Sequence, residues 1–141
     1  MSKVNVIYWS QTGNTQKMAE AVAAGINEAG GEAVLQFVSQ VSAADLADVP
    51  AFALGCPAMG AEVLEEGEFE PFVASLEGSV SGKKIALFGS YGWGDGEWMR
   101  DWETRMTQAG ATVVNGEGLI CQEAPDDSAI DDCKALGAAL V

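Results

Sequence analysis

The fold is decided by the stretch Val4-Asn5-Val6-Ile7-Tyr8-Trp9-Ser10-Gln11-Thr12-Gly13-Asn14-Thr15. It begins as a short apolar, β-branched run, which is typical of a strand buried on both faces. Hydroxyl, glycine and amide residues follow, and from about Asn14 the apolar spacing becomes helical. The first turn of a helix leaves backbone N–H groups without partners, so a loop of this kind is a potential anion site.

The side chains of this loop are neutral donors. Ser10, Thr12 and Thr15 supply hydroxyl groups, Gly13 lets the backbone approach a ligand closely, and no Lys or Arg lies in the loop. The pattern Gly-x-x-x-x-Gly-Lys-Ser/Thr is absent, so this is not a Walker loop. Two interpretations remain at this point: a phosphate bound through neutral donors, or a plain helix cap.

Acidic residues greatly outnumber basic ones. The chain has 21 Asp and Glu against 7 Lys and Arg, a net charge of −14 and a pI near 4.1. Such a charge repels nucleic acid and anionic membranes and favours positively charged protein partners. The sequence has no histidine, the side chain that most often transfers protons near neutral pH. We therefore predict no catalytic residues and no metal site.

Length and cysteine content indicate one cytoplasmic domain. The chain has 141 residues, 48% of them hydrophobic, which is enough for one core, so we expect a single domain over residues 1–141. Three cysteines without Cys-x-x-Cys spacing or a secretory signal fit reduced thiols in a cytosol. No apolar run is long enough to span a bilayer, so we expect a soluble protein in the cytoplasm.

Apolar strands alternate with helical segments along the rest of the chain. We expect strands at 33–37, 51–55, 84–88 and 112–121, the last interrupted at 115–118. Helical spacing marks the segments 69–76, 99–106 and 130–140, and Ser128-x-x-Asp131 predicts a capping box for the last helix. Between 38 and 50 we expect at most one helical turn, at 44–46. This alternation predicts an α/β fold, with a doubly wound parallel sheet and helices on both faces.

Right-handed crossovers place the loops after strands one, three and four at one sheet edge, where doubly wound sheets bind ligands. The second loop, Ala58-Met59-Gly60-Ala61-Glu62, offers a polarizable sulfur, a glycine turn and a carboxylate. The third, Ser90-Tyr91-Gly92-Trp93-Gly94-Asp95, offers an aromatic ring between glycines. Phosphate donors at one end and flat apolar surfaces at the other predict a site for an aromatic mononucleotide.

Three segments carry a family resemblance: residues 9–15, 55–60 and 88–94. In this order they resemble the flavodoxins, most closely the short-chain flavodoxins of anaerobic clostridia and their relatives. The resemblance covers the whole chain and implies a five-stranded parallel sheet of order 2-1-3-4-5. At Ala61 the sequence departs from the clostridial type, which often has Asp there, so no side-chain role is expected at that corner.

The resemblance implies a low-potential one-electron carrier rather than an enzyme with its own substrate. Such a protein binds FMN non-covalently and shuttles electrons between redox enzymes through semiquinone and hydroquinone states. The implied partners are basic-faced reductases and ferredoxin-dependent oxidoreductases, and we expect a monomer. We also expect the acids Glu62, Glu65, Glu66 and Asp95 to lower the potential and to form the docking face.

Three alternative functions agree less well with the sequence. A small FMN-dependent reductase of the same fold is the main alternative, although little sequence is left for a substrate pocket. A receiver domain needs acidic residues where this chain has Ser10-Gln11 and Gly55-Cys56. A binding module without a cofactor is the third.

The resemblance implies FMN contacts from all three loops. The first loop would hold the phosphate, with Met59 on the inner face of the ring and Trp93 on the outer face. The Glu62 side chain would accept the ring N3–H, and the Gly60 carbonyl would turn toward N5–H. The predicted set is Ser10, Gln11, Thr12, Gly13, Asn14, Thr15, Ala58, Met59, Gly60, Ala61, Glu62, Ser90, Tyr91, Gly92, Trp93, Gly94 and Gln122, in which Ser90 to Gly92 meet the pyrimidine end and Ala58 and Gln122 the ribityl chain.

Overall fold

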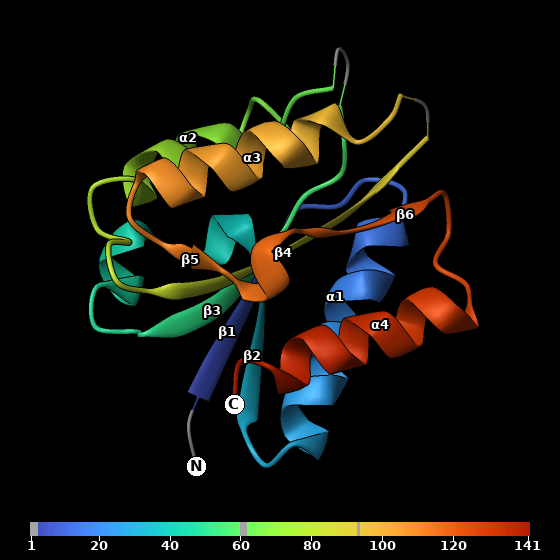
Figure 1. Cartoon of the computed structure of the whole chain (residues 1–141), viewed down its shortest axis with the longest axis horizontal. Coiled ribbons are helices and arrows are strands. Elements are labelled where there is room, and N and C mark those ends of the chain that lie inside the picture. The colour runs from blue at the N-terminus through green and yellow to red at the C-terminus, as the bar shows by residue number, and fades with distance from the viewer. Residues whose placement is uncertain (1–2, 60–61, 93) are drawn as a thin grey trace.

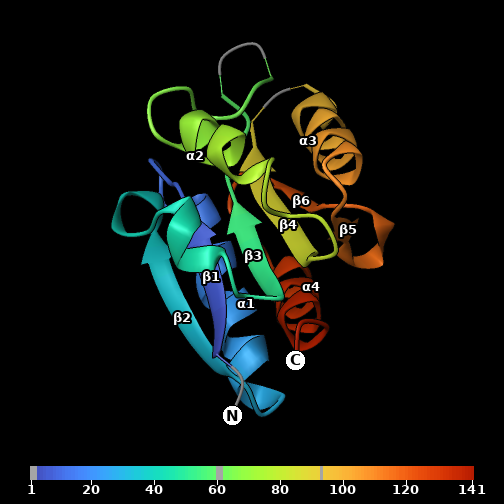
Figure 2. The ribbon, with the colours of Figure 1, turned by 90° about the vertical axis from the view of Figure 1, so that its left-hand side faces the viewer.

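A computed structural model describes residues 3–59, 62–92 and 94–141, and its centre is a parallel sheet (Figures 1 and 2). The strands are β1 (Lys3–Tyr8), β2 (Glu32–Phe37), β3 (Ala51–Gly55), β4 (Lys84–Tyr91), β5 (Thr112–Val113) and β6 (Leu119–Gln122). Their order is β2-β1-β3-β4-β5, and β6 also pairs with β4. The predicted order 2-1-3-4-5 is confirmed, with β5 and β6 sharing the fifth position.

The register of the central strands brings three loops to one edge. Tyr8 lies opposite Gly55, and Gly55 lies opposite Phe88, so β1, β3 and β4 reach their carboxyl ends close together. Backbone hydrogen bonds continue past the strands, from Trp9 N to the Gly55 carbonyl at 3.0 Å and from Ala58 N to the Ser90 carbonyl at 3.1 Å. The loops that follow the three strands therefore start from fixed, neighbouring positions.

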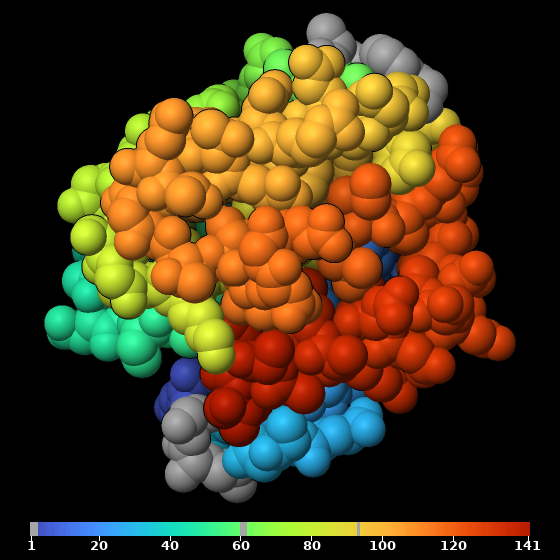
Figure 3. Space-filling model, viewed as in Figure 1, coloured from blue at the N-terminus to red at the C-terminus, as the bar shows by residue number. Residues whose placement is uncertain are grey.

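Two helices cover each face of the sheet. Helices α1 (Asn14–Glu28) and α4 (Asp127–Ala138) lie on one face, and α2 (Phe69–Leu76) and α3 (Glu97–Gln108) lie on the other (Figures 1 and 2). In the space-filling view the segment that contains β5 and β6 lies at the surface between α3 and α4 (Figure 3). The sheet thus has one hydrophobic core on each side, as the helical spacing of buried Met18, Val22 and Ile26 on one side and Met99, Trp102 and Met106 on the other requires.

Local structure departs from the sequence prediction in three places. Strand β4 runs to Tyr91 rather than ending at residue 88. The capping box predicted at Ser128 is wrong: α4 begins at Asp127, and the Asp126 side chain accepts a hydrogen bond from Ala129 N at 2.8 Å. Asp126 has extended backbone angles, which the residue before a helix needs, whereas Ser128 already lies in the first turn. The segment after β2 contains two 3-10 turns, Val38–Gln40 and Ala43–Leu46, rather than one.

Along the part of the chain that the structure describes, none of the helices combines the length and the apolar character that crossing a bilayer requires.

Candidate cofactor site

The loops after β1, β3 and β4 converge on one cleft at the carboxyl edge of the sheet. The cleft has a volume of 150 Å³ and is lined by residues from all three loops and from the end of β6, namely Gln11, Thr12, Asn14, Pro57, Ala58, Met59, Ser90, Tyr91, Gly92 and Glu123. Segments that are far apart in the sequence thus form a single concave surface. This is the arrangement that binds ligands in doubly wound sheets.

The first loop presents backbone donors at the start of α1. Gly13 precedes the helix with φ of 95°, in the left-handed region that favours glycine. The Ser10 hydroxyl oxygen accepts hydrogen bonds from Gly13 N at 3.2 Å and Gln16 N at 3.3 Å. Amide groups here thus converge on an oxygen atom, and no acidic residue lies in the first turn of α1. A phosphate group fits this donor set and the positive end of the helix dipole.

Thr15 connects the first loop to the third. Its side chain is 1% exposed, and its hydroxyl lies 3.3 Å from the Ser90 hydroxyl. Ser90 N also donates to the Thr15 hydroxyl oxygen, at 3.4 Å. In this structure the Thr15 hydroxyl therefore faces Ser90 inside the protein, whereas Thr12 of the same loop lines the cleft.

A backbone bridge joins Met59 of the second loop to Val63. The bridge is antiparallel, with N···O distances of 2.8 and 3.0 Å between the two backbones. Met59 lines the cleft, as does Ala58. Gly60 and Ala61, which we predict as cofactor contacts, lie outside the described residues.

The structure places the Glu62 carboxylate at the start of α3 rather than in the cleft. One of its oxygens accepts hydrogen bonds from Gly96 N at 3.2 Å and Glu97 N at 3.1 Å. Gly94 leaves room for this contact, because a β-carbon at residue 94 would lie 2.5 Å from the carboxylate carbon of Glu62. Of the predicted site residues, Glu62 and Gly94 are thus brought together beside the cleft.

The third loop is bonded to the end of β6. Tyr91 and Gly92 line the cleft, the Gln122 side-chain amide donates to the Gly92 carbonyl at 3.3 Å, and Glu123 N donates to the Tyr91 carbonyl at 2.8 Å. Trp93, the predicted outer-face residue, lies outside the described residues. Sequence reasoning missed Pro57 and Glu123. Glu123 directly follows a strand of the same sheet. The expectation that ligands bind at the carboxyl ends of the strands therefore applies to it as well.

Two side chains that follow or precede the second loop in sequence, those of Glu65 and Cys56, accept hydrogen bonds from backbone N–H groups. The Glu65 carboxylate accepts hydrogen bonds from Gly67 N and Glu68 N, both at 2.7 Å, and from Phe69 N at 2.9 Å, and so caps α2. Burial alone would raise the pKa of Glu65, but these three N–H groups outweigh it and lower the pKa. Cys56 accepts a hydrogen bond from Glu65 N, and burial raises the pKa of its thiol to about 12. Cys56 is therefore a neutral, structural thiol.

A doubly wound parallel sheet, an amide-rich loop at a helix N-terminus and a cleft between three carboxyl-edge loops define an α/β protein of the mononucleotide-binding class. Residues 6–137 match the flavodoxin family. The chain is 52% identical over 134 residues to a flavodoxin of Clostridium beijerinckii, covering 95% of this chain and 96% of the relative. It is 43% identical over 136 residues to a flavodoxin of Megasphaera elsdenii, covering 96% of each.

Similarity to a solved structure agrees with these relatives. The chain superposes on the solution structure of two-electron reduced Megasphaera elsdenii flavodoxin with a TM-score of 0.86 and 42% identity, over 97% of both chains. This chain therefore belongs to the flavodoxin family, whose members are low-potential, FMN-containing electron carriers rather than enzymes. The predicted family, fold, cofactor and electron-carrier function are confirmed, and the alternative of a small FMN-dependent reductase is set aside.

Proposed function

We propose that FMN binds in the cleft at the carboxyl edge, with its phosphate at residues 10–15 and its ring against Met59. The observation that carries this proposal is the convergence of the three loops on one cavity. The lining combines neutral polar side chains of the first loop, Gln11, Thr12 and Asn14, with Ala58, Met59 and Tyr91 of the other two loops. This polarity matches a phosphate joined to a flat aromatic ring.

The remaining proposed contacts follow from the loops' positions. The backbone of Ser90 to Gly92 meets the pyrimidine end of the ring, and Gln122, whose amide is bonded to Gly92, lies near the ribityl chain. Contacts from Gly60, Ala61 and Trp93 stay predictions from the sequence. Gly96 N and Glu97 N both donate to the same oxygen of the Glu62 carboxylate, so its second oxygen can accept the ring N3–H while these bonds at α3 are kept.

FMN supplies the one-electron chemistry when it is bound, and the chain sets the charge around it. The first loop has no cation to offset the phosphate, and the protein carries a net charge of −14. Glu123 lines the cleft itself. Additional negative charge in this environment is unfavourable, which favours a low reduction potential.

We infer that electron donors and acceptors approach the same edge with positively charged surfaces. Glu123 is exposed and lines the cleft, and Glu97, also exposed, begins α3 next to the Glu62 carboxylate. Of the cations, Lys3 and Lys84 begin strands β1 and β4 and so lie at the opposite edge. A monomer of one domain, residues 1–141, in the cytoplasm is also proposed, supported by two cores that share one sheet and by three free cysteines.

Binding of FMN and riboflavin to the apoprotein tests the cleft. Thr12 lines it, so Thr12→Ala should weaken FMN binding by about 1–3 kcal/mol, the range for a hydrogen bond to a charged group, and leave riboflavin binding unchanged. Thr104→Ala, which removes an exposed threonine hydroxyl on α3, is the matched control and should change neither. An equal loss for both ligands in Thr12→Ala would show that the phosphate does not bind at this loop.

A further inference from the structure

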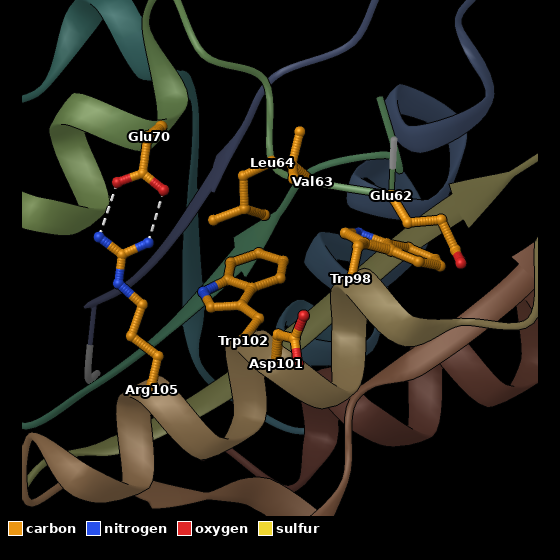
Figure 4. Close-up of a pocket in the computed structure, with 8 residues that line it drawn as sticks. All are labelled: Glu62, Val63, Leu64, Glu70, Trp98, Asp101, Trp102 and Arg105. Atoms are coloured by element: carbon orange, nitrogen blue, oxygen red, sulfur yellow. Dashed lines mark hydrogen bonds and ion pairs between the residues drawn. The ribbon is translucent and has the colours of Figure 1, made fainter. Parts of the chain in front are cut away.

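We propose that a pocket between α2 and α3 receives a lysine side chain of a redox partner, next to the cofactor cleft. The pocket has a volume of 120 Å³ and is lined by Glu62, Val63, Leu64, Glu70, Trp98, Asp101, Trp102 and Arg105 (Figure 4).

The floor of the pocket is apolar. Leu64 is 6% exposed, and Trp98 and Trp102 are 1% exposed each, so the edges of two indole rings and a leucine close the pocket from below. Figure 4 shows Leu64 over the ring of Trp102 and Glu62 over that of Trp98, with Asp101 beside them on α3. Such a floor suits the methylene stem of a lysine, whose charged group stays at the rim.

Carboxylates dominate the rim. Glu62, Glu70 and Asp101 all line the pocket, against the single cation Arg105 among the described lining residues. Arg105 is already bound, by both oxygens of Glu70 at 2.6 and 2.7 Å and by Glu77. Within the described residues Asp101 forms no ion pair. The pocket therefore has a net negative charge and a carboxylate available to an incoming ammonium group.

The pocket and the cofactor cleft are connected through the backbone bridge between Met59 and Val63. Met59 lines the cleft, whereas Val63, its bridge partner, lines the pocket and is 40% exposed. A partner whose lysine enters the pocket would therefore press against the loop that carries Met59. This step rests on the proposed function, because it places FMN in the cleft.

The net charge of −14 argues against other occupants. It repels a second copy of this chain, and the carboxylates of Glu62, Glu70 and Asp101 disfavour an anionic ligand at this pocket. Of the two cationic side chains, lysine has the compact head group, whereas the guanidinium of arginine is broad and planar. The small volume of the pocket favours the ammonium.

Butylammonium chloride reproduces the lysine stem and head group and can be titrated into the ¹⁵N-labelled, FMN-loaded protein. The indole N–H signals of Trp98 and Trp102 are the reporters, and we expect both to shift to saturation. Asp101→Asn should raise the dissociation constant about two- to fivefold, as for an exposed ion pair. Asp131→Asn, the same charge change on the opposite face of the sheet, should leave it unchanged. Equal saturable shifts with 1-butanol in matched sodium chloride, or no difference between Asp101→Asn and wild type, would overturn the proposal.

Electron transfer from the reduced protein to a basic c-type cytochrome extends the test to a protein partner. At low salt, Asp101→Asn should slow the second-order rate about twofold or more relative to Asp131→Asn, with FMN affinity unchanged. A second outcome is a rate that falls with salt in all three proteins while Asp101→Asn and Asp131→Asn have the same rate. In that case partners do approach the carboxyl edge with positive charge, and the lysine pocket is wrong. A rate independent of salt in wild type would refute this approach to the carboxyl edge itself.

Discussion

Replacing Glu65 should destabilise the protein in a pH-dependent way. Its carboxylate accepts three backbone N–H bonds at 2.7, 2.7 and 2.9 Å at the start of α2. Helix caps contribute about 0.5–2 kcal/mol. Because Glu65 is partly exposed but makes three bonds, we expect Glu65→Ala to lower the free energy of unfolding by about 1–2 kcal/mol. For a chain of this size that corresponds to a fall in Tm of roughly 2–8 °C.

The sign of the pH dependence follows from the lowered pKa of Glu65. A carboxylate whose pKa is lower in the folded protein stabilises the fold above the pKa of the unfolded chain. That contribution disappears as the pH falls through the folded pKa. The free-energy difference between wild type and Glu65→Gln should therefore be largest near pH 7 and shrink in the acid range.

Urea unfolding of the FMN-loaded protein, followed by far-UV circular dichroism at several pH values, measures this difference. Glu66→Gln is the matched control, because Glu66 is the exposed neighbour, and it should change stability by less than about 0.5 kcal/mol. If Glu66→Gln costs as much as Glu65→Gln, or if the Glu65→Gln difference is the same at acid and neutral pH, the capping role is refuted.

Two further predictions concern buried polar groups. Lys83 is 9% exposed and donates to the carbonyls of residues 46, 47 and 49 at 2.7–2.9 Å. Lys83→Met should cost about 2–4 kcal/mol in urea unfolding with FMN affinity unchanged, and a Met variant of wild-type stability would contradict this. Thr15→Val and Ser90→Ala should each cost about 1–3 kcal/mol, and a double-mutant cycle should give a coupling near 1 kcal/mol, whereas strict additivity would show that the two hydroxyls do not interact.

Most of the fold could be predicted because its signals are local. The buried face of α1 follows from apolar residues at helical spacing, and the buried strands follow from β-branched runs, whatever the rest of the chain does. The cap of α4 could not be decided in the same way. Asp126 and Ser128 are both good caps two residues apart, and the choice depends on which of them the preceding loop holds in an extended conformation.

The candidate site was predicted less completely, for a related reason. Right-handed crossovers place three loops at one edge of the sheet. Most of the residues that line the cleft could therefore be predicted from the sequence. The position of the Glu62 carboxylate depends instead on a contact between two loops. It reaches the start of α3 because Gly94, with φ of 89°, leaves space that a side chain would fill. No pattern within either loop encodes that approach.

Three of the four acids predicted to set the reduction potential and the docking face thus have a second, local role. Glu65 caps α2, Glu62 binds the first amides of α3, and Asp95 pairs with Arg100 at 3.0 Å. Neutralising any of these three removes or weakens such a contact as well as a charge, so their effects on the reduction potential combine two causes. Glu66 and Glu123 are the cleaner probes: both are exposed, and among the described residues neither carboxylate accepts a hydrogen bond. Neutralising Glu66 or Glu123 should therefore show the purely electrostatic effect of the acidic surface on the reduction potential. This effect should diminish as salt is added, because salt screens the charges.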